Sequence, residues 1–320
     1  MIFGVAFAIA VLISGIVLLN ISSDKAVEHS IHCASALGIS SLMIGLILVS
    51  VGTDLPEIAN SIISCASGHG DIDVGDSLGS VLTQITLVLG LLPFLGKGFR
   101  VKRKETLIIG AFEVLAIALA TAVVLTGFTR EKALLLIASW PVFLFIIRRT
   151  STKKIAKKRQ HVSQPSRHYL YHLVIAALGF VGVAIGGIAV VQSVISLSRE
   201  LGISEFFISF FGLAIGTSLP ELAVDLRAIH KRQYELAIGD IIGSCIVDAT
   251  VSISIGQLFF PTPVLVESFT RARFLSLIFY AIIASLVVII TLSLRKKVDR
   301  KAGVLFISLY SFTYALLYIT

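Results

Sequence analysis

Apolar stretches separated by short polar connections run along almost the whole chain. Crossing a membrane as a helix takes roughly 20 apolar residues. The connection from Asn20 to His32 is predicted to be a polar loop after the first helix. The pattern predicts an all-α integral membrane protein with almost nothing left for a soluble domain. Ten transmembrane helices are expected, at residues 2–20, 36–67, 72–96, 106–127, 131–148, 169–198, 202–229, 235–260, 273–294 and 302–319.

Short polar motifs inside these stretches occur twice, each time 164 residues apart. The matched segments are LGIS at 37–40 and 201–204, GTDLPE at 52–57 with GTSLPE at 216–221, and GDSLGS at 75–80 with GDIIGS at 239–244. Three matches at one offset indicate an internal repeat. Because each half holds five helices, an odd number, the second half must enter the membrane upside down. We therefore expect a five-helix repeat at 1–149, a basic cytoplasmic linker at 150–168 and an inverted five-helix repeat at 169–320, with the broken second and seventh helices at the core.

Composition agrees with a membrane protein, since 56% of the 320 residues are hydrophobic and 14% are charged. A net charge of +8 could suggest a nucleic-acid partner, but most of the 27 Lys and Arg residues fall in alternate connections between the helices. Those connections are expected to face the cytoplasm. This places the protein in the cell membrane with both termini extracellular. Anionic lipid is the expected neighbour of the linker, and a monomer is the expected assembly.

The apolar stretches also contain carboxylates, which are costly at roughly 2.5–3.5 kcal/mol each in the middle of a membrane. No Lys or Arg lies in the same cores to neutralise them, so a bound cation is the simplest compensation. Oxygen ligands without imidazole or thiolate favour Ca²⁺ or Na⁺ over Zn²⁺ or Cu²⁺. No cofactor is predicted. The carboxylates of the paired motif segments are Asp54, Glu57, Asp76, Glu221, Asp240 and Asp248.

A proline stands next to each motif glutamate, Pro56 before Glu57 and Pro220 before Glu221. Proline has no N–H and clashes with the preceding turn, so each helix should break there. Broken backbone at membrane depth is tolerated where it lines a cavity. The carbonyls expected to lose helical partners and face an ion lie around Ser50, Thr53, Ala214 and Thr217.

Glycines four residues apart should bring the third and eighth helices close to the broken helices. These are Gly75 with Gly79, and Gly239 with Gly243. A serine follows each pair and would offer its hydroxyl to the same centre, unless that hydroxyl bonds back to its own helix. The two serines are Ser80 and Ser244.

The two blocks, GTxLPE and GxxxGS at a fixed separation, resemble the alpha-1 and alpha-2 repeats of the Ca²⁺/cation antiporter superfamily, most closely its prokaryotic sodium/calcium exchangers. The resemblance implies exchange of Ca²⁺ for Na⁺ by alternating access, with helices 1 and 6 sliding across a fixed core. It implies that Glu57 and Glu221 hold Ca²⁺ with the carbonyls of Thr53 and Thr217. It assigns Na⁺ to the same glutamates together with Ser50, Ala214, Ser218, Ser80 and Ser244.

Some positions depart from the family pattern. Asp54 stands where the family usually has a serine, as Ser218 does in the second half, and Gln84 stands where asparagine or aspartate is expected. Asp248 is the repeat counterpart of Gln84, and all three stay in the candidate set. Because an added carboxylate can take up a proton in place of Na⁺, antiport of H⁺ or another cation against Ca²⁺ is the alternative.

Two other function classes are weighed against antiport. A passive cation channel would use the same acidic core without coupling. The Gly-Asp pairs ending at Asp76 and Asp240 suggest an intramembrane aspartyl protease, but such an enzyme has no use for the twin proline-glutamate motifs. The absence of a Walker glycine loop argues against an ATP-driven pump, and we expect a secondary transporter that is not an enzyme.

The remaining polar residues are expected to have local roles. Glu113 is a lone carboxylate that should pair with a neighbouring helix, with a functional role as the alternative. Asp225 should form a charge pair with Arg227 at the inner mouth. His29 and His32 are three residues apart, and His168 and His172 are four apart. Neither histidine pair has a third ligand nearby, so we expect a solvated loop for the first pair and an interfacial position for the second.

Overall fold

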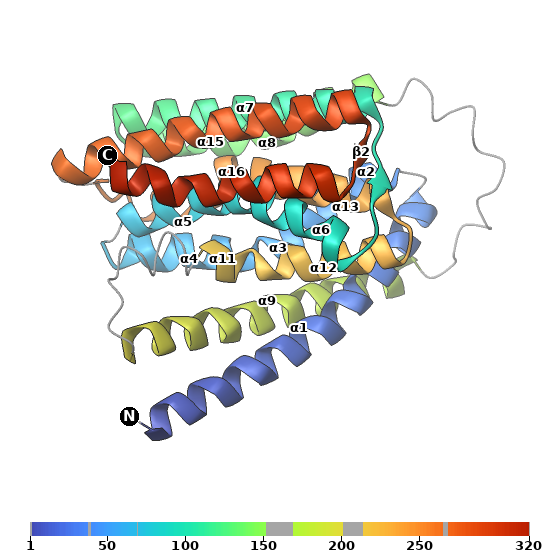
Figure 1. The fold of residues 1–320 in the computed structure, drawn as a ribbon, viewed down its shortest axis with the longest axis horizontal. Helices are drawn as coiled ribbons and strands as arrows, with labels where there is room; N and C mark the ends of the chain where they lie inside the picture. The colour runs from blue at the N-terminus through green and yellow to red at the C-terminus, as the bar shows by residue number, and fades with distance from the viewer. Residues whose placement is uncertain are drawn as a thin grey trace.

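The computed structural model describes residues 2–37, 40–68, 70–151, 169–200, 214–264 and 268–319. These residues form an almost entirely helical bundle (Figure 1). Most of the predicted linker and the second LGIS motif, at 201–204, lie outside the described residues.

Short π-helical turns, labelled η, lie between some of the shorter helices. The first half holds α1 (Ile2–Leu37), α2 (Ser41–Ile44), η1 (Gly45–Val49), α3 (Ser50–Thr53), α4 (Leu55–Ala66), α5 (Gly70–Leu82), η2 (Thr83–Val88), α6 (Leu89–Leu95), β1 (Phe99–Arg100), α7 (Arg103–Thr126) and α8 (Arg130–Ser151). The second half holds α9 (Tyr169–Glu200), α11 (Ala214–Thr217), α12 (Leu219–His230), α13 (Tyr234–Val247), η5 (Asp248–Ser252), α14 (Ile253–Phe259), α15 (Ser268–Arg295), β2 (Lys297–Val298) and α16 (Arg300–Ile319).

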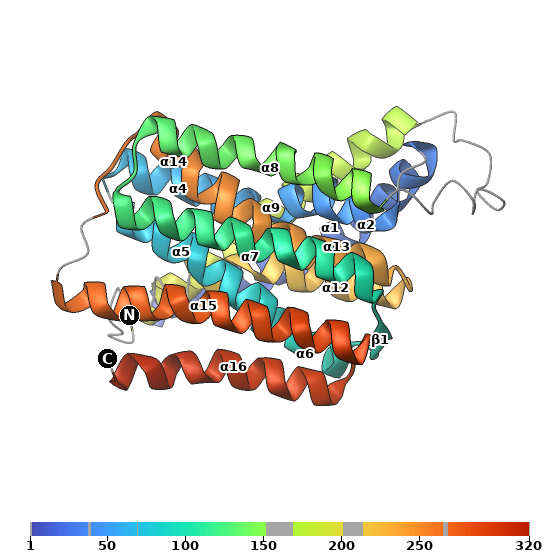
Figure 2. The same ribbon diagram turned by 90° about the horizontal axis from the view of Figure 1, so that it is seen from above.

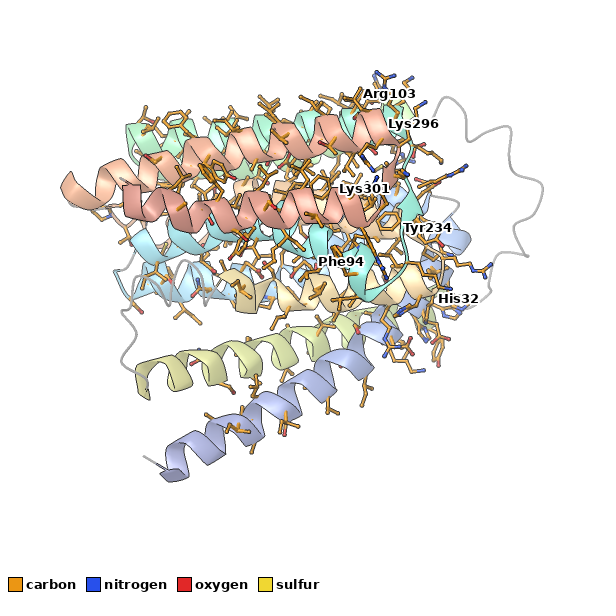
Figure 3. All side chains as sticks on the ribbon, in the orientation of Figure 1. His32, Phe94, Arg103, Tyr234, Lys296 and Lys301 are labelled. Atoms are coloured by element: carbon orange, nitrogen blue, oxygen red, sulfur yellow. The ribbon has the colours of Figure 1, made fainter. Side chains whose placement is uncertain are left out.

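The length and apolarity of these helices fit a protein that crosses a membrane several times. Six helices in the described part are long and apolar enough to span, and the bent pair Ser41–Thr53 with Leu55–Ala66 would make a seventh. Figure 1 marks both chain ends at one end of the bundle. Arg103, Lys296 and Lys301 lie at the opposite end (Figure 3). The prediction of a helical protein with several membrane-spanning segments is confirmed.

The polar loop predicted from Asn20 to His32 is wrong, because α1 continues through it as one helix to Leu37. No Gly or Pro interrupts the chain from residue 16 to residue 37. Some polar residues within this extension are fully buried, among them Ser23 and Ser30. The extension packs along α9 and also contacts α12, so tertiary contacts favour helix where polarity alone suggested a loop.

The predicted break in each motif helix is confirmed, and it falls two residues before the proline. Asp54 (φ −78°, ψ 5°) separates α3 from α4, and Ser218 (φ −82°, ψ 2°) separates α11 from α12. The bend between the first two segments is 45°. Pro56 and Pro220 therefore stand in the first turn of a new helix, where a missing N–H costs nothing.

A two-residue β-ladder joins two connections at the basic end of the bundle. Phe99 pairs with Val298 and Arg100 with Lys297, in antiparallel register. The ladder leads into α15 and α16, which run side by side (Figure 2). Next to the ladder, the carboxylate of Asp299 binds Lys297, the N–H of Ala302 and Arg295, and these contacts hold its pKa below the usual range. The sequence pattern did not indicate this pairing.

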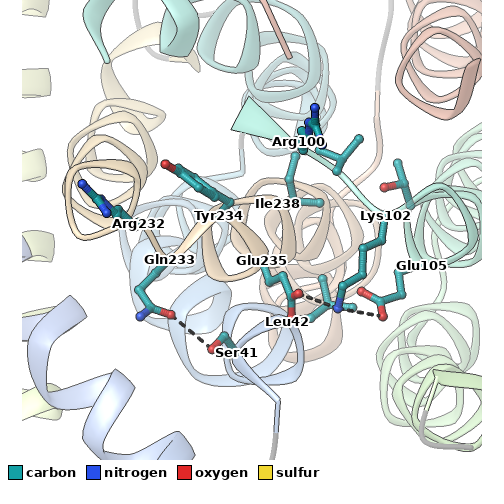
Figure 4. Close-up of a pocket in the computed structure, with 12 residues that line it drawn as sticks. Ser41, Leu42, Arg100, Lys102, Glu105, Arg232, Gln233, Tyr234, Glu235 and Ile238 are labelled. Atoms are coloured by element: carbon teal, nitrogen blue, oxygen red, sulfur yellow. Dashed lines mark hydrogen bonds and ion pairs between the residues drawn. The ribbon is translucent and has the colours of Figure 1, made fainter. Parts of the chain in front are cut away.

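A cavity of about 580 Å³ opens at the same end of the bundle. Lys102 reaches across it to Glu235 and Glu105, and the Ser41 hydroxyl donates to the Gln233 side chain (3.3 Å) (Figure 4). None of the motif glutamates lines this cavity. The acidic candidate site is therefore a separate, more deeply enclosed place.

Candidate ion-binding site

Three carboxylates meet where the broken helices face each other. Asp54, Glu57 and Glu221 each bring one oxygen within 4.8 Å of the others. Asp54 lies at the break itself, and each glutamate lies in the first turn beyond its own break. All three side chains are buried. Two segments 164 residues apart in sequence thus supply a single acidic centre.

This centre lacks any counter-charge from the protein within the described residues. No buried Lys or Arg is found among them, and neither oxygen of Asp54, Glu57 or Glu221 accepts a hydrogen bond there. Burying unpaired carboxylates costs several kcal/mol each unless they gain a proton or a cation. Three carboxylate ligands with nearby hydroxyls match the oxygen coordination of Ca²⁺. The donor set therefore fits a hard cation.

Hydroxyl groups link each broken helix to the paired glycine motif of the other half. Thr53 Oγ1 lies 3.3 Å from Ser244 Oγ, and Thr217 Oγ1 lies 3.2 Å from Ser80 Oγ. The two contacts are repeat counterparts. Ser80 and Ser244 thus contact another helix. Their partners, Thr53 and Thr217, are the last residues before the two helix breaks.

Two further candidates, Ser50 and Ser218, bond back to their own helices. Ser50 Oγ donates to the Leu46 carbonyl (2.9 Å) and Ser218 Oγ to the Ala214 carbonyl (2.8 Å). The prediction that the carbonyls of Ser50 and Ala214 lose helical partners is wrong. They accept the N–H groups of Asp54 (3.0 Å) and Ser218 (3.2 Å), because each helix keeps its hydrogen bonds up to the break.

Gln84 and Asp248 form a direct contact across the pseudo-symmetric centre. Gln84 Nε2 donates to Asp248 Oδ2 at 3.0 Å, and both residues are buried. They lie in the π-helical turns η2 and η5. Such turns widen a helix by one residue and are frequent at functional sites. The repeat paired these positions, but nothing in the residue pattern indicated the π turns.

The glycine pair of the second half packs as predicted. A Cβ on Gly239 would overlap the carbonyl oxygen of Leu42, and one on Gly243 would lie 2.9 Å from the Cα of Leu46. Gly75, the counterpart of Gly239, has no described atom within 4 Å of such a Cβ. The backbone of α13 therefore packs closely against the backbones of α2 and η1.

Asp76 and Asp240 are repeat counterparts in different surroundings. Asp76 accepts the Asn60 side-chain amide (2.7 Å) and the Thr217 hydroxyl (3.4 Å). Asp240 accepts the Thr53 hydroxyl (3.4 Å), but the counterpart of Asn60 in its half is Val224, which has no donor. The first carboxyl is satisfied and the second is only partly so.

Asp225 is not at the inner mouth, contrary to prediction. Its side chain is fully buried, its oxygens accept no hydrogen bond in the described part, and its carboxyl faces Asp240 and Glu221. A local charge pair with Arg227 was expected there because the two residues are near each other in sequence. Helix α12 instead turns Asp225 onto the same face as Glu221, one turn away.

Replacing Asp225 with asparagine should stabilise the protein in buffer free of Ca²⁺ and Na⁺. The amide would donate to Asp240 and remove an unsatisfied carboxyl, a gain of about 1–3 kcal/mol. Thermal unfolding in detergent would measure a higher midpoint. Asp76→Asn is the matched control and should gain nothing, since Asp76 already accepts Asn60. A midpoint at or below that of the wild type for Asp225→Asn would contradict this account.

Glu113 of α7 is fully buried, but neither of its carboxylate oxygens has a hydrogen-bond partner among the described residues, so the predicted pairing with a neighbouring helix is not seen as a hydrogen bond. It faces Ser285 of α15, and it lies near the Cys245 thiol of α13. That thiol in turn contacts Gln84 Oε1 (3.5 Å). Glu113 thus lies outside the acidic centre, one side chain removed from the Gln84–Asp248 pair.

Known proteins that resemble this chain match it over nearly its whole length. The family model described as sodium/calcium exchanger protein matches residues 7–148 and again residues 171–319. The uncharacterized membrane protein MJ0091 of Methanocaldococcus jannaschii is 28% identical over 92% of this chain and 93% of that protein. The sodium/calcium exchanger MaX1 of Methanosarcina acetivorans is 25% identical over 97% of this chain and 98% of its own.

A solved structure shows the same fold. The sodium-calcium exchanger NCX_Mj, soaked with Na⁺ and Sr²⁺, superposes with a TM-score of 0.77 at 27% identity. The match covers 97% of this chain and 99% of that chain. The same family model matches both halves of the chain, and each matched half contains one copy of the acidic motifs. The chain belongs to the sodium/calcium exchanger protein family.

Proposed function

We propose that this protein is a secondary antiporter that exchanges Ca²⁺ for Na⁺ across the cell membrane by alternating access. The observation that carries the proposal is the buried meeting of Asp54, Glu57 and Glu221 at two helix breaks. Membership of the exchanger family supports it. Both ions would use the two glutamates, so one ion must leave before the other binds, and this competition couples the two fluxes.

The proposed ligands follow the geometry of the centre. Ca²⁺ would be held by Glu57 and Glu221 with backbone oxygens of Thr53 and Thr217, and Asp54 adds a carboxylate within reach. Oxygens for Na⁺ would come from the remaining candidates around the same centre, Ser50, Ser80, Ala214, Ser218 and Ser244. The Gln84–Asp248 contact would close the centre on the side of the π turns.

We propose ten membrane helices arranged as two inverted five-helix repeats with both termini extracellular. The separate family matches to each half support the repeat. The shared location of the chain ends, opposite Arg103, Lys296 and Lys301, supports the orientation. In this arrangement α1 and α9, which pack mainly on each other, are the pair that would slide across the core.

Ca²⁺ uptake into vesicles that contain the purified protein tests the function directly. An outward Na⁺ gradient should drive uptake in the wild type, and dissipating the gradient should stop it. A proton gradient of the same direction is the comparison that separates Na⁺ from H⁺ as the driving ion. Antiport is ruled out if neither gradient drives uptake, and conductance without coupling would indicate a channel.

Asp54→Ser should weaken the competition of protons with Ca²⁺ and move the driving-ion preference toward Na⁺. The variant gives the first half the residue that Ser218 provides in the second. Removing a carboxyl from the centre removes one place for a proton, so the proton concentration for half-inhibition should rise several-fold. Uptake measured over a range of pH checks this. Glu105→Gln, at the basic end, is the control, and an unchanged profile in Asp54→Ser would place Asp54 outside the ion path.

A further inference from the structure

Three histidines from two different helices gather near the basic end of the bundle. His29 and His32 lie on α1 and His172 lies on α9. His29 Nδ1 is 3.0 Å from His172 Nδ1, and the rings of His32 and His172 stack with centroids 4.4 Å apart. The sequence offered two separate histidine pairs without a third ligand. Packing of α1 along α9 is what unites members of both pairs.

The spacing of the two Nδ1 atoms is close to that of a chelating pair. Zinc binds imidazole nitrogen at about 2.0–2.1 Å, so two ligands of a tetrahedral ion lie about 3.4 Å apart. To admit an ion between them, the two nitrogens must move apart by a few tenths of an ångström and the rings must turn so that both lone pairs point at the ion. His29 is 8% exposed and held between neighbouring rings, including that of Tyr171 at 5.8 Å. Packing thus keeps His29 beside His172 before any ion arrives.

His32 can supply a third ligand. Its ring is exposed, and its centroid lies 6.2 Å from that of His29. Among the described residues only Asp54, Glu57 and Glu221 bring three ligand atoms within 4.8 Å of one another, so His32 must turn about its side-chain bonds to complete the site. An exposed ring can do so, and water can fill the fourth position.

We propose that His29, His172 and His32 form a binding site for a divalent transition-metal ion that joins α1 to α9. Imidazole ligands suit Zn²⁺, Ni²⁺ or Cu²⁺ and not Ca²⁺, so this site selects against the ion carried by the acidic centre. On binding, the ring that donates its Nδ1 proton changes tautomer. Its proton moves to Nε2 by exchange with water, and both Nδ1 lone pairs then face the ion. The bound ion fixes the position of α1 along α9.

Calorimetric titration of the purified full-length chain with Zn²⁺ tests the site. An excess of Ca²⁺ keeps Zn²⁺ from the acidic centre. We expect one Zn²⁺ per chain, with at least about tenfold weaker binding in His29→Ala and in His172→Ala and a smaller loss in His32→Ala. His230→Ala, which removes an exposed histidine at the end of α12, is the control and should bind as the wild type does. Unchanged affinity in both His29→Ala and His172→Ala would overturn the proposal.

X-ray absorption at the zinc edge gives a second measurement that does not depend on the variants folding. The expected spectrum shows two or three imidazole nitrogens at about 2.0 Å. A spectrum with oxygen ligands alone, or zinc binding that disappears in Glu57→Gln and persists in His29→Ala, would place the ion in the acidic centre and overturn the site. Because zinc binding is measured without transport, these outcomes are independent of the proposed exchange activity.

Discussion

Ca²⁺ uptake should be abolished by Glu57→Gln and, separately, by Glu221→Gln. Each change keeps the shape of the side chain and removes one negative charge from the group of three buried carboxylates that would bind the cation. Removing one partner of a buried ionic contact typically costs about 3–5 kcal/mol, which corresponds to at least about a hundredfold weaker Ca²⁺ binding. Gradient-driven uptake and Ca²⁺ binding by calorimetry would both report the loss.

Glu113→Gln is the matched control for those two variants. Glu113 is as deeply buried as the motif glutamates but faces Ser285 and lies outside the acidic centre. It should retain Ca²⁺ binding and uptake. If Glu57→Gln or Glu221→Gln transported Ca²⁺ at the wild-type rate, the acidic centre would not be the transport site. Equal losses in all three variants would point to a general defect of folding.

Gly239→Ala should be strongly destabilising. A Cβ at Gly239 overlaps the backbone carbonyl oxygen of Leu42 and comes within 3.3 Å of the Cα of Gly45. Backbone atoms cannot turn aside as a flexible side chain can, so α13 must move away from α2 and η1. Overpacking of this kind costs about 1–3 kcal/mol and sometimes more. The midpoint of thermal unfolding in detergent should fall, and Ca²⁺ binding should weaken because Thr53 and Ser244 lose their contact.

Gly75→Ala is the comparison at the repeat counterpart. No described atom lies within 4 Å of a Cβ at Gly75, and alanine favours helix over glycine by about 0.5–1 kcal/mol. It should therefore lose less stability than Gly239→Ala. The packing argument fails if the two variants unfold at the same temperature.

The repeat shows why much of the fold and the site could be predicted from residues alone. A carboxylate in an apolar membrane segment is energetically costly, and a proline beside it breaks the helix. The two together indicate a functional centre. Because that combination occurs twice at one offset, the sequence predicted that Glu57 and Glu221 belong together, and it predicted the helix breaks beside them. These two glutamates do meet, together with Asp54, which lies at the first of the two breaks.

Other features of the fold depend on which residues of different helices face each other. The order of residues along the chain does not show this. Polarity predicted a loop after Asn20, but burial against α9 and α12 makes it helix. Asp225 was expected at the inner mouth, and the rotation of α12 places it beside Asp240 instead. The π turns at Gln84 and Asp248 were likewise not indicated by the residue pattern.

By itself, the sequence determined a multi-pass helical membrane protein with an internal repeat and an acidic centre, because apolar length, helix-breaking proline and uncompensated charge are properties of each segment alone. Only the tertiary structure decided that Asp225 faces Asp240, that Gly239 lies against the backbone of Leu42 and that His29 meets His172. Each of those contacts joins two helices, and the rotation of one helix against another follows from the packing of all their side chains together.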